Sequence, residues 1–237
     1  MSSQQEKELI SGLIKAQRPK IIIEVGVAWG GMSKNMVQAM EQNIIDSGEE
    51  AWYTGFDGWE VHGLQNQFAA FGTLEDVDKV LNWQSTHYAL VKIDTQKNQS
   101  EFRSELRNRF TNGIDFAFID GCHSYQGIAN DFFNVWPHMN PHGIVAFHDT
   151  AVIDGCREFI ADLRTHNNGS YDVSDYPVGD PRKHGVTVIT TPGYGDVKID
   201  EICGSLSTPD QIYEKERLNQ NYPPLDQWWL DNLKERI

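Results

Sequence analysis

The sequence predicts one α/β domain with a mostly parallel β-sheet and helices on both of its faces. Between residues 21 and 147, five short apolar runs recur that have the length of buried strands. The segments between them place apolar residues at every third or fourth position, which is the helical period. A chain of 237 residues has room for one sizeable core, so we expect a single domain over 1–237.

The expected elements follow one another in a simple order. An amphipathic helix is expected within 1–18. Strands are expected at 21–25, 52–56, 88–93, 114–119 and 144–147. Helices are expected around 36–40, 102–110, 128–135 and 156–163. Right-handed crossovers would make the five strands parallel. The stretch GVTVITTPGYGDVKID, 185–200, predicts two more strands around a Pro/Gly turn, an antiparallel hairpin at one sheet edge.

Two segments fit no regular element, 58–74 and 165–184. Loops of this length in a compact domain commonly serve as lids or binding loops, and simple surface irregularity is the alternative. If they are substrate lids, Trp59, His62 and His184 would line the pocket of the acceptor.

Composition argues against several classes of partner. The formal net charge is −14, and the longest basic run is the pair Arg182–Lys183, so we expect neither a nucleic-acid partner nor an anionic membrane surface. No stretch approaches eighteen apolar residues, so we expect no membrane span. A small molecule is the better default partner.

The number and spacing of the cysteines indicate the cellular compartment of the protein. Cys122, Cys156 and Cys203 are odd in number and widely spaced, which suits reduced thiols, so we expect a soluble, cytoplasmic protein. The pair Trp228–Trp229 near the C-terminus would supply a surface for a homo-oligomer, although the sequence leaves the oligomeric state open.

A glycine-rich turn follows the first expected strand. In IIIEVGVAWGGMS, Gly26 and Gly30 allow a tight turn into a helix whose free N–H groups could meet a ligand. The third position of a dinucleotide fingerprint counted from Gly26 is Ala28, so a nicotinamide cofactor fits poorly. Glu24, Gly26 and Gly30 together resemble the first motif of class I S-adenosylmethionine-dependent methyltransferases. An ordinary strand-to-helix turn is the alternative.

Carboxylates follow the next two strands. Asp57 at the end of YTGFD is placed to accept hydrogen bonds from two ribose hydroxyls, or else to cap a loop. Asp94 follows the third strand, where the same families often recognise adenine. With Glu24, these residues place three carboxyl groups at the ends of strands along one sheet edge, which is what binding of a nucleoside requires.

The fourth and fifth strands end in Asp120 and in His148–Asp149. If these strands are neighbours, the two aspartates meet at the sheet edge and repel each other unless a positive charge lies between them. Carboxylates with an imidazole suit a divalent cation such as magnesium or manganese. The alternative is that Asp120 only contacts the cofactor or caps the next helix, while His148 packs beneath it.

The stretch FIDGCHSYQGIANDFFNVWPHMNPHGIVAFHDT resembles the signature of methyltransferase family 24. These metal-dependent O-methyltransferases include cephalosporin hydroxylase-like and sugar-modifying relatives. The likeness covers roughly 20–150 and implies a Rossmann-like class I methyltransferase fold with a seven-stranded sheet. Assigned position by position, it implies cofactor-binding roles for Glu24, Gly26, Gly30, Ser33, Asp57, Asp94 and Asp120. It also implies metal-binding roles for Asp120 and Asp149, and it places His148 where relatives have either a third metal ligand or a residue that contacts the ligands.

One departure from the family pattern concerns the general base. Several sugar-modifying relatives have a carboxylate two residues after the first metal aspartate, where this chain has Cys122. The neighbouring His123 could accept the proton instead, with Asp120 as the second catalytic residue, or it could be a helix-start histidine bonded to the loop. Tyr125 would either orient the substrate or pack as a core aromatic.

These observations predict an O-methyltransferase that uses S-adenosylmethionine and a divalent cation (magnesium or manganese). Its acceptor would be a small hydroxylated metabolite or sugar, with a sugar or phenolic hydroxyl as the methylated group. One alternative is a metal-independent methyltransferase that acts on nitrogen or on a protein. Another is a catalytically silent module that only binds S-adenosylmethionine.

Overall fold

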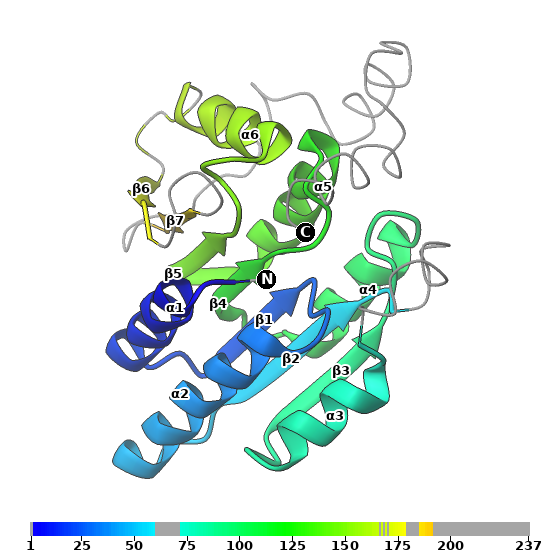
Figure 1. Ribbon diagram of the computed structural model, residues 1–237, viewed down its shortest axis with the longest axis vertical. Coiled ribbons are helices and arrows are strands. Elements are labelled where there is room, and N and C mark those ends of the chain that lie inside the picture. The colour runs from blue at the N-terminus through cyan, green and yellow to red at the C-terminus, as the bar shows by residue number, and fades with distance from the viewer. Residues whose placement is uncertain are drawn as a thin grey trace.

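The computed structural model shows a seven-stranded sheet in the order β3-β2-β1-β4-β5-β7-β6 (Figure 1). It describes residues 2–59, 72–165, 167, 169, 171–178 and 185–191. Strands β1 to β5 are parallel, whereas β7 is antiparallel to both β5 and β6. The predicted fold class, a mostly parallel sheet with an antiparallel pair at one edge, is confirmed.

The elements have the following bounds. The strands are β1 Ile21–Val25, β2 Trp52–Asp57, β3 Tyr88–Lys92, β4 Ile114–Ile119, β5 Met139–Phe147, β6 Asp172–Tyr176 and β7 Val186–Thr190. The helices are α1 Gln4–Gln17, α2 Gly31–Ser47, α3 Leu74–Asn82, α4 Gln99–Arg109, α5 Tyr125–Val135, α6 Asp154–Thr165 and the 3-10 turn η1 Trp136–His138.

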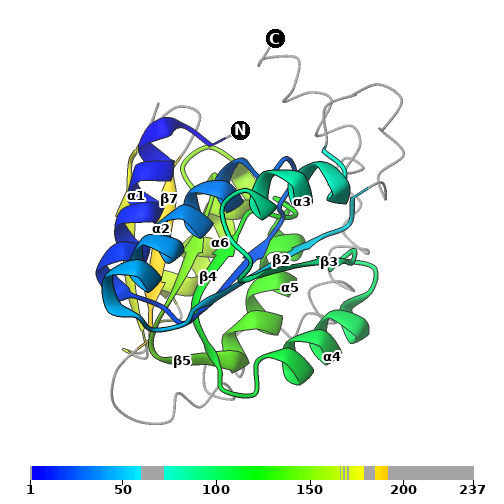
Figure 2. The same ribbon diagram turned by 90° about the horizontal axis from the view of Figure 1, so that it is seen from below.

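Helices cover both faces of the sheet, as Figure 2 shows. Helices α1, α2 and α3 pack on one face, and α4, α5 and α6 pack on the other. Strand side chains alternate between the two cores, so that Ile22 and Phe116 join the first and Ile23 and Ala117 join the second. Burial on both faces explains why these strands are continuous apolar runs in the sequence.

The partner of β7 differs from the one expected. The hairpin was predicted within 185–200, but β7 pairs with β6, which lies before it in the chain. The expectation that 165–184 contains no regular element is therefore wrong for Asp172–Tyr176. The sequence DVSDY has only one aliphatic residue and lies at the sheet edge, so it shows no apolar run. Residues 192–200 lie outside the described residues.

Helix α3 is an element that the sequence reading missed. It begins directly after Thr73, whose side chain accepts a hydrogen bond from the backbone of Asp76, and it buries Val77 and Leu81. The helix begins at Leu74, the last residue of the segment 58–74 that we expected to be irregular. Its capping box and the spacing of its apolar residues were nevertheless present in the sequence.

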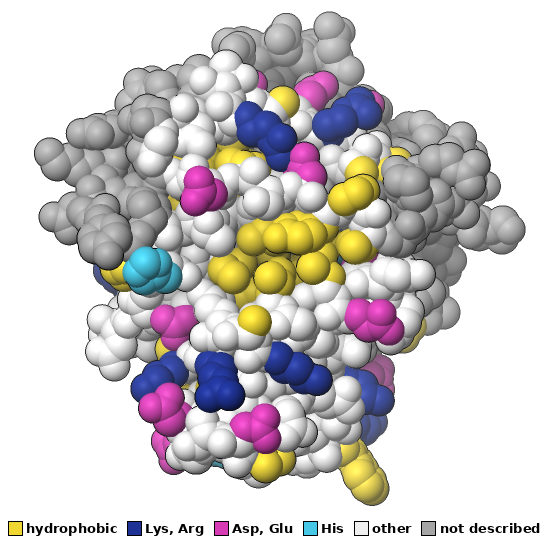
Figure 3. All heavy atoms as spheres, turned by 90° about the vertical axis from the view of Figure 1, so that its left-hand side faces the viewer, with side chains coloured by type: hydrophobic (Ala, Val, Ile, Leu, Met, Phe, Trp, Pro, Cys, Tyr) yellow, Lys and Arg dark blue, Asp and Glu magenta, His cyan; other side chains and the backbone are white. Residues whose placement is uncertain are grey.

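The part of the chain that the structure describes contains no helix with both the length and the hydrophobicity needed to cross a bilayer. Figure 3 shows the face on the left of Figure 1, where charged side chains of both signs surround one hydrophobic patch. Several sequence predictions fall outside the described residues and stay predictions. They concern His62, Arg182, Lys183, His184, Cys203, Trp228 and Trp229.

Candidate cofactor and metal site

The site lies where the strand order reverses, between β1 and β4. Val25 pairs with Phe56 on one side and with Ile119 on the other, and Ile119 pairs with Phe147. The carboxyl ends of β2, β1, β4 and β5 therefore lie at one level. This is the crevice in which open α/β sheets bind their ligands, and it brings the predicted residues of four strands together.

The glycine turn comes into direct contact with the loop after β4. Gly26 has φ +90°, and a Cβ atom there would overlap the Asp120 carbonyl and lie 2.5 Å from the Gly121 nitrogen. Gly30, with φ +71°, is the N-cap of α2 and provides no capping side chain. The first N–H groups of α2 therefore have no side-chain cap and can meet a ligand carboxylate.

Glu24 lies beneath this turn and is 1% exposed. Its carboxyl group accepts hydrogen bonds from the hydroxyls of Ser33 on α2 and Tyr53 on β2. Burial raises the pKa of Glu24 to about 8, although these two bonds oppose the shift. Glu24 thus ties β1, β2 and α2 together, and its hydrogen bond with Ser33 supports the turn. The cofactor-binding roles of both residues stay predictions.

Asp57 shapes the same turn. One carboxylate oxygen accepts hydrogen bonds from the backbone N–H groups of Val27 and Ala28, both at 2.8 Å. The other accepts the N–H of Trp59 at 2.8 Å. Trp59 is 4% exposed and its indole N–H donates to the Ala28 carbonyl, so it packs against the turn. Each carboxylate oxygen has two lone pairs and three of the four are engaged, so Asp57 can accept one more hydrogen bond, from one ribose hydroxyl.

Asp94 lies two residues beyond β3. Its Oδ1 accepts hydrogen bonds from the backbone N–H groups of Gln96 and Lys97. Gln96 in turn donates to the buried Asp131 of α5 at 3.0 Å. Burial raises the pKa of Asp131 to about 7. Asp94 therefore orders the loop beside the crevice, and its predicted contact with adenine is untested.

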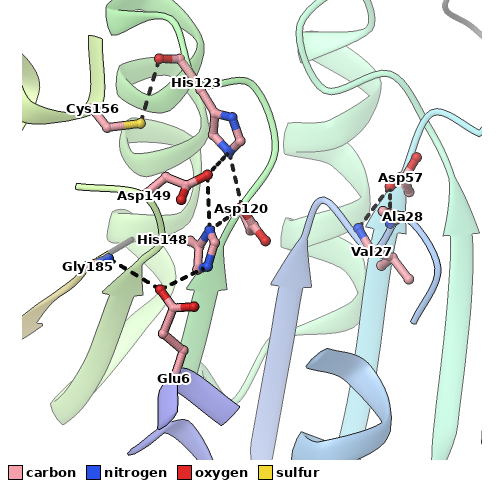
Figure 4. Close-up of polar contacts among 10 residues, drawn as sticks. All are labelled: Glu6, Val27, Ala28, Asp57, Asp120, His123, His148, Asp149, Cys156 and Gly185. Atoms are coloured by element: carbon pink, nitrogen blue, oxygen red, sulfur yellow. Dashed lines mark hydrogen bonds and ion pairs between the residues drawn. The ribbon is translucent and has the colours of Figure 1, made fainter. Parts of the chain in front are cut away.

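Four side chains converge at the ends of β4 and β5 (Figure 4). Asp120, His123, His148 and Asp149 each offer a ligand atom, and these atoms all lie within 4.8 Å of one another. The Nδ1 atom of His148 lies 3.0 Å from Asp120 Oδ1 and 3.3 Å from Asp149 Oδ2. The Asp120 side chain is 21% exposed, against 4% for Asp149, so the cluster is most accessible from the Asp120 side.

The cluster is electrostatically coupled. Burial alone would lower the pKa of His148, but the adjacent Asp120, Asp149 and Glu6 carboxylates raise it well above its ordinary value. Burial alone would raise the pKa of Asp120 and of Asp149, yet the neighbouring histidines hold both below their usual range. The aspartates thus stay ionised around a positive charge. A divalent cation could take that place with release of the histidine proton.

Backbone conformation at Asp149 is unusual. Its φ of +56° is left-handed, a region that non-glycine residues rarely occupy and that recurs at functional sites. The adjacent Thr150 N–H donates to the Gly185 carbonyl at 3.2 Å, and the Asp149 carbonyl accepts from Ile153 at the start of α6. These bonds hold the turn that directs Asp149 toward Asp120.

The residues after Asp120 take distinct places. His123 Nε2 lies 3.1 Å from Asp120 Oδ1 and 3.8 Å from Asp149 Oδ2, inside the cluster. Burial raises the pKa of the Cys122 thiol, which keeps it neutral. Tyr125 donates its hydroxyl to Asp162 of α6 at 2.7 Å, so that contact joins two helices. His123 alone of these three faces the cluster.

Sequence reasoning missed Glu6. This residue of α1 is 0% exposed, and its Oε1 lies 3.2 Å from His148 Nε2. Burial opposes ionisation, but the bonds from His148 and Ser3 lower its pKa to about 2. The spacing of Ser3 and Glu6 was a visible capping-box signal, whereas the contact with His148 spans 142 positions and required the fold.

Comparisons with known proteins bear on the family and the fold. The profile of a family described as a methyltransferase domain matches residues 23–150. The fold resembles that of the O-methyltransferase TomG of Streptomyces achromogenes in complex with SAM (TM-score 0.60, 17% identity). The likeness covers 81% of this chain and 82% of that chain. It also resembles an O-methyltransferase from Bacillus cereus in complex with SAH (TM-score 0.61, 10% identity, 81% and 82% covered).

Two curated relatives match shorter stretches. The uncharacterized protein R132 of Acanthamoeba polyphaga mimivirus is 32% identical over 95 residues, 36% of this chain and 42% of that protein. The uncharacterized protein y4gI of Sinorhizobium fredii is 26% identical over 140 residues, 59% of this chain. That match spans only 14% of y4gI, so the chain covers less than half the length of either relative.

Proposed function

Because this chain belongs to methyltransferase family 24, we propose that it transfers the methyl group of S-adenosylmethionine to a hydroxyl oxygen with the help of a divalent cation. The observation that carries the proposal is the cluster of Asp120, His123, His148 and Asp149, which lies directly against the glycine turn. Cofactor and cation would therefore be neighbours, as an assisted transfer to oxygen requires.

The donor set fits a divalent cation. The carboxylates of Asp120 and Asp149 and the imidazole of His148 belong to a cluster whose ligand atoms lie within 4.8 Å of one another. They supply oxygen and nitrogen donors of the kind that manganese accepts, and the carboxylates also suit magnesium. A cation bound there would make a nearby acceptor hydroxyl more acidic. The partial exposure of Asp120 leaves one side on which an acceptor could approach.

The glycine turn fits the cofactor. The uncapped first turn of α2 can receive the carboxylate of the methionine part, while Asp57 can accept one hydrogen bond from a ribose hydroxyl. S-adenosylmethionine would supply an electrophilic methyl group, so the protein mainly has to align the attacking oxygen in line with it. Small hydroxylated metabolites, among them sugars and phenols, are the acceptor class that we propose.

We assign His123 the role of proton acceptor. Its Nε2 atom faces the cluster, and the neutral Cys122 at the position of the usual base cannot take a proton. His123→Gln separates this role from that of a metal ligand. If His123 is the base, the variant should lower kcat about 100-fold or more and keep its manganese affinity. If His123 is a metal ligand, the variant should lose that affinity. Stopped-assay kinetics and manganese titration measure the two quantities.

The test of the function is calorimetric titration of S-adenosylmethionine, with and without manganese, into wild-type protein and three variants. Asp57→Ala should lose cofactor affinity, and Asp120→Ala should lose metal affinity. Asp46→Ala, on the exposed side of α2, should change neither. Absence of cofactor binding in the wild type under all conditions would sink the proposal.

The two alternatives give different results in an acceptor screen. A metal-independent methyltransferase acting on nitrogen or on a protein would keep its activity in the presence of a chelator. A silent module would bind S-adenosylmethionine without forming S-adenosylhomocysteine on any acceptor, and the neutral Cys122 is the observation that favours it. The proposed enzyme forms the product with a hydroxylated acceptor and loses the activity on chelation.

A further inference from the structure

The N-terminal helix α1 contributes a buried carboxylate to the site. Glu6 lies in the first turn of α1 and is 0% exposed, and Figure 4 shows it pointing toward His148 from below the cluster. The distance between Glu6 Oε1 and His148 Nε2 is 3.2 Å. A fully buried glutamate requires partners, and two of them, His148 and Gly185, lie far from Glu6 in the chain, whereas Ser3 belongs to the same turn.

Groups other than His148 fix the position of this carboxylate. Its Oε2 accepts the backbone N–H of Ser3 at 2.6 Å, and its Oε1 accepts the backbone N–H of Gly185 at 3.3 Å. The Ser3 hydroxyl accepts the N–H of Glu6 in return, which completes a capping box. The oxygen that faces His148 is therefore held in place by backbone donors.

This arrangement selects which nitrogen of His148 enters the cluster. An ionised carboxylate only accepts hydrogen bonds, so His148 must present its N–H at Nε2 toward Glu6. Its Nδ1 atom then lies between Asp120 and Asp149, at 3.0 Å and 3.3 Å from their oxygens. The ring is packed edge-on against Phe118, with centroids 6.0 Å apart, which restricts its rotation further.

We propose that Glu6 is a positioning residue that holds His148 with Nε2 protonated and Nδ1 directed at the cation. The inference rests on the proposed function, because it takes the cluster as a cation site. Carboxylate partners of this kind orient histidine ligands and strengthen them as donors, and their loss typically weakens metal binding about 10- to 100-fold. Helix α1 is then part of the site as well as of the core.

The test measures manganese binding alone, by electron paramagnetic resonance of the free ion, in Glu6→Gln. We expect its affinity to be about 10- to 100-fold weaker than that of the wild type. Nuclear magnetic resonance supplies a second readout. The hydrogen-bonded Nε2 proton of His148 should be visible in the wild type and shifted or lost in Glu6→Gln, even without metal.

A control variant separates this role from helix stability. Glu8→Gln makes the same chemical change at an exposed position of α1, and it should keep wild-type manganese affinity. If Glu6→Gln fails to fold, Glu6→Asp keeps the acidic group but withdraws it by one methylene, and we expect it also to weaken manganese binding.

Wild-type affinity in a folded Glu6 variant, with an unchanged His148 proton, would overturn this inference alone. A wild-type protein that binds S-adenosylmethionine but no manganese would overturn the cation site and the inference together.

Discussion

The close contact between the glycine turn and the β4 loop makes Gly26→Ala a sharp test of the site. Gly26 has φ +90°, so any other residue there adopts a left-handed conformation, at a cost of roughly 1–2 kcal/mol. The new methyl group would also overlap the Asp120 carbonyl and lie 2.5 Å from the Gly121 nitrogen. Both are backbone atoms that cannot rotate away. Overpacking of this kind costs about 1–3 kcal/mol. Together with the conformational cost, we expect the free energy of unfolding to fall by about 2–5 kcal/mol in Gly26→Ala.

A matched control isolates the clash. Gly48, at the C-terminus of α2, also has a left-handed φ, +71°, but a Cβ atom there would meet nothing within 4 Å. Gly48→Ala should therefore show only the conformational cost of roughly 1–2 kcal/mol. Urea unfolding measures both variants, and titration with S-adenosylmethionine should show weakened binding in Gly26→Ala alone. Equal losses of stability in the two variants would refute the argument that the turn and the β4 loop are in tight contact.

Two further predictions concern the surroundings of the site. Asp131 has its pKa raised by burial from 3.8 to about 7, so the folded chain keeps a proton that the unfolded chain has lost. The free energy of unfolding should therefore fall as pH rises from about 4 to about 7, and Asp131→Asn should remove up to roughly 4 kcal/mol of that fall. Urea unfolding at several pH values measures this difference. The prediction is wrong if the free energies of unfolding of wild type and Asp131→Asn change equally between about pH 4 and about pH 7. Tyr125→Phe removes the hydrogen bond to Asp162 and should cost about 1 kcal/mol in the same assay. Its manganese affinity should stay unchanged, and a loss would show that Tyr125 acts within the site.

Much of the candidate site could be read from the sequence because it follows from the ends of strands. Apolar runs located the strands, and the acidic or histidine residue after each run marked its carboxyl end, as at Asp57, Asp120 and Asp149. Parallel strands bring such ends to one edge, and strands that follow one another in the chain commonly lie side by side, as β4 and β5 do. The convergence of Asp120, His148 and Asp149 was therefore predictable before their distances were known.

Some features were missed because they have no local pattern in the sequence, whereas α3 was missed although its capping box was visible. Strand β6 is short, polar and at the sheet edge, so its pairing with β7 depends on the neighbouring strand more than on its own residues. The hydrogen bonds of Asp57 also could not be predicted from the sequence. Its type and place were evident, yet its bonds to Val27 and Ala28 depend on how the turn folds back over β2.

The sequence by itself determined the fold class, the family and the chemical types gathered at the sheet edge, because hydrophobic periodicity and motif spacing are local properties. The tertiary structure alone decided that Glu6 lies behind His148. The packing of α1 on the sheet brings Glu6 to the ring, and the pairing of β7 with β5 brings Gly185 to the Glu6 carboxylate. Contacts between such distant residues depend on the whole core, so they became visible only once the fold was known.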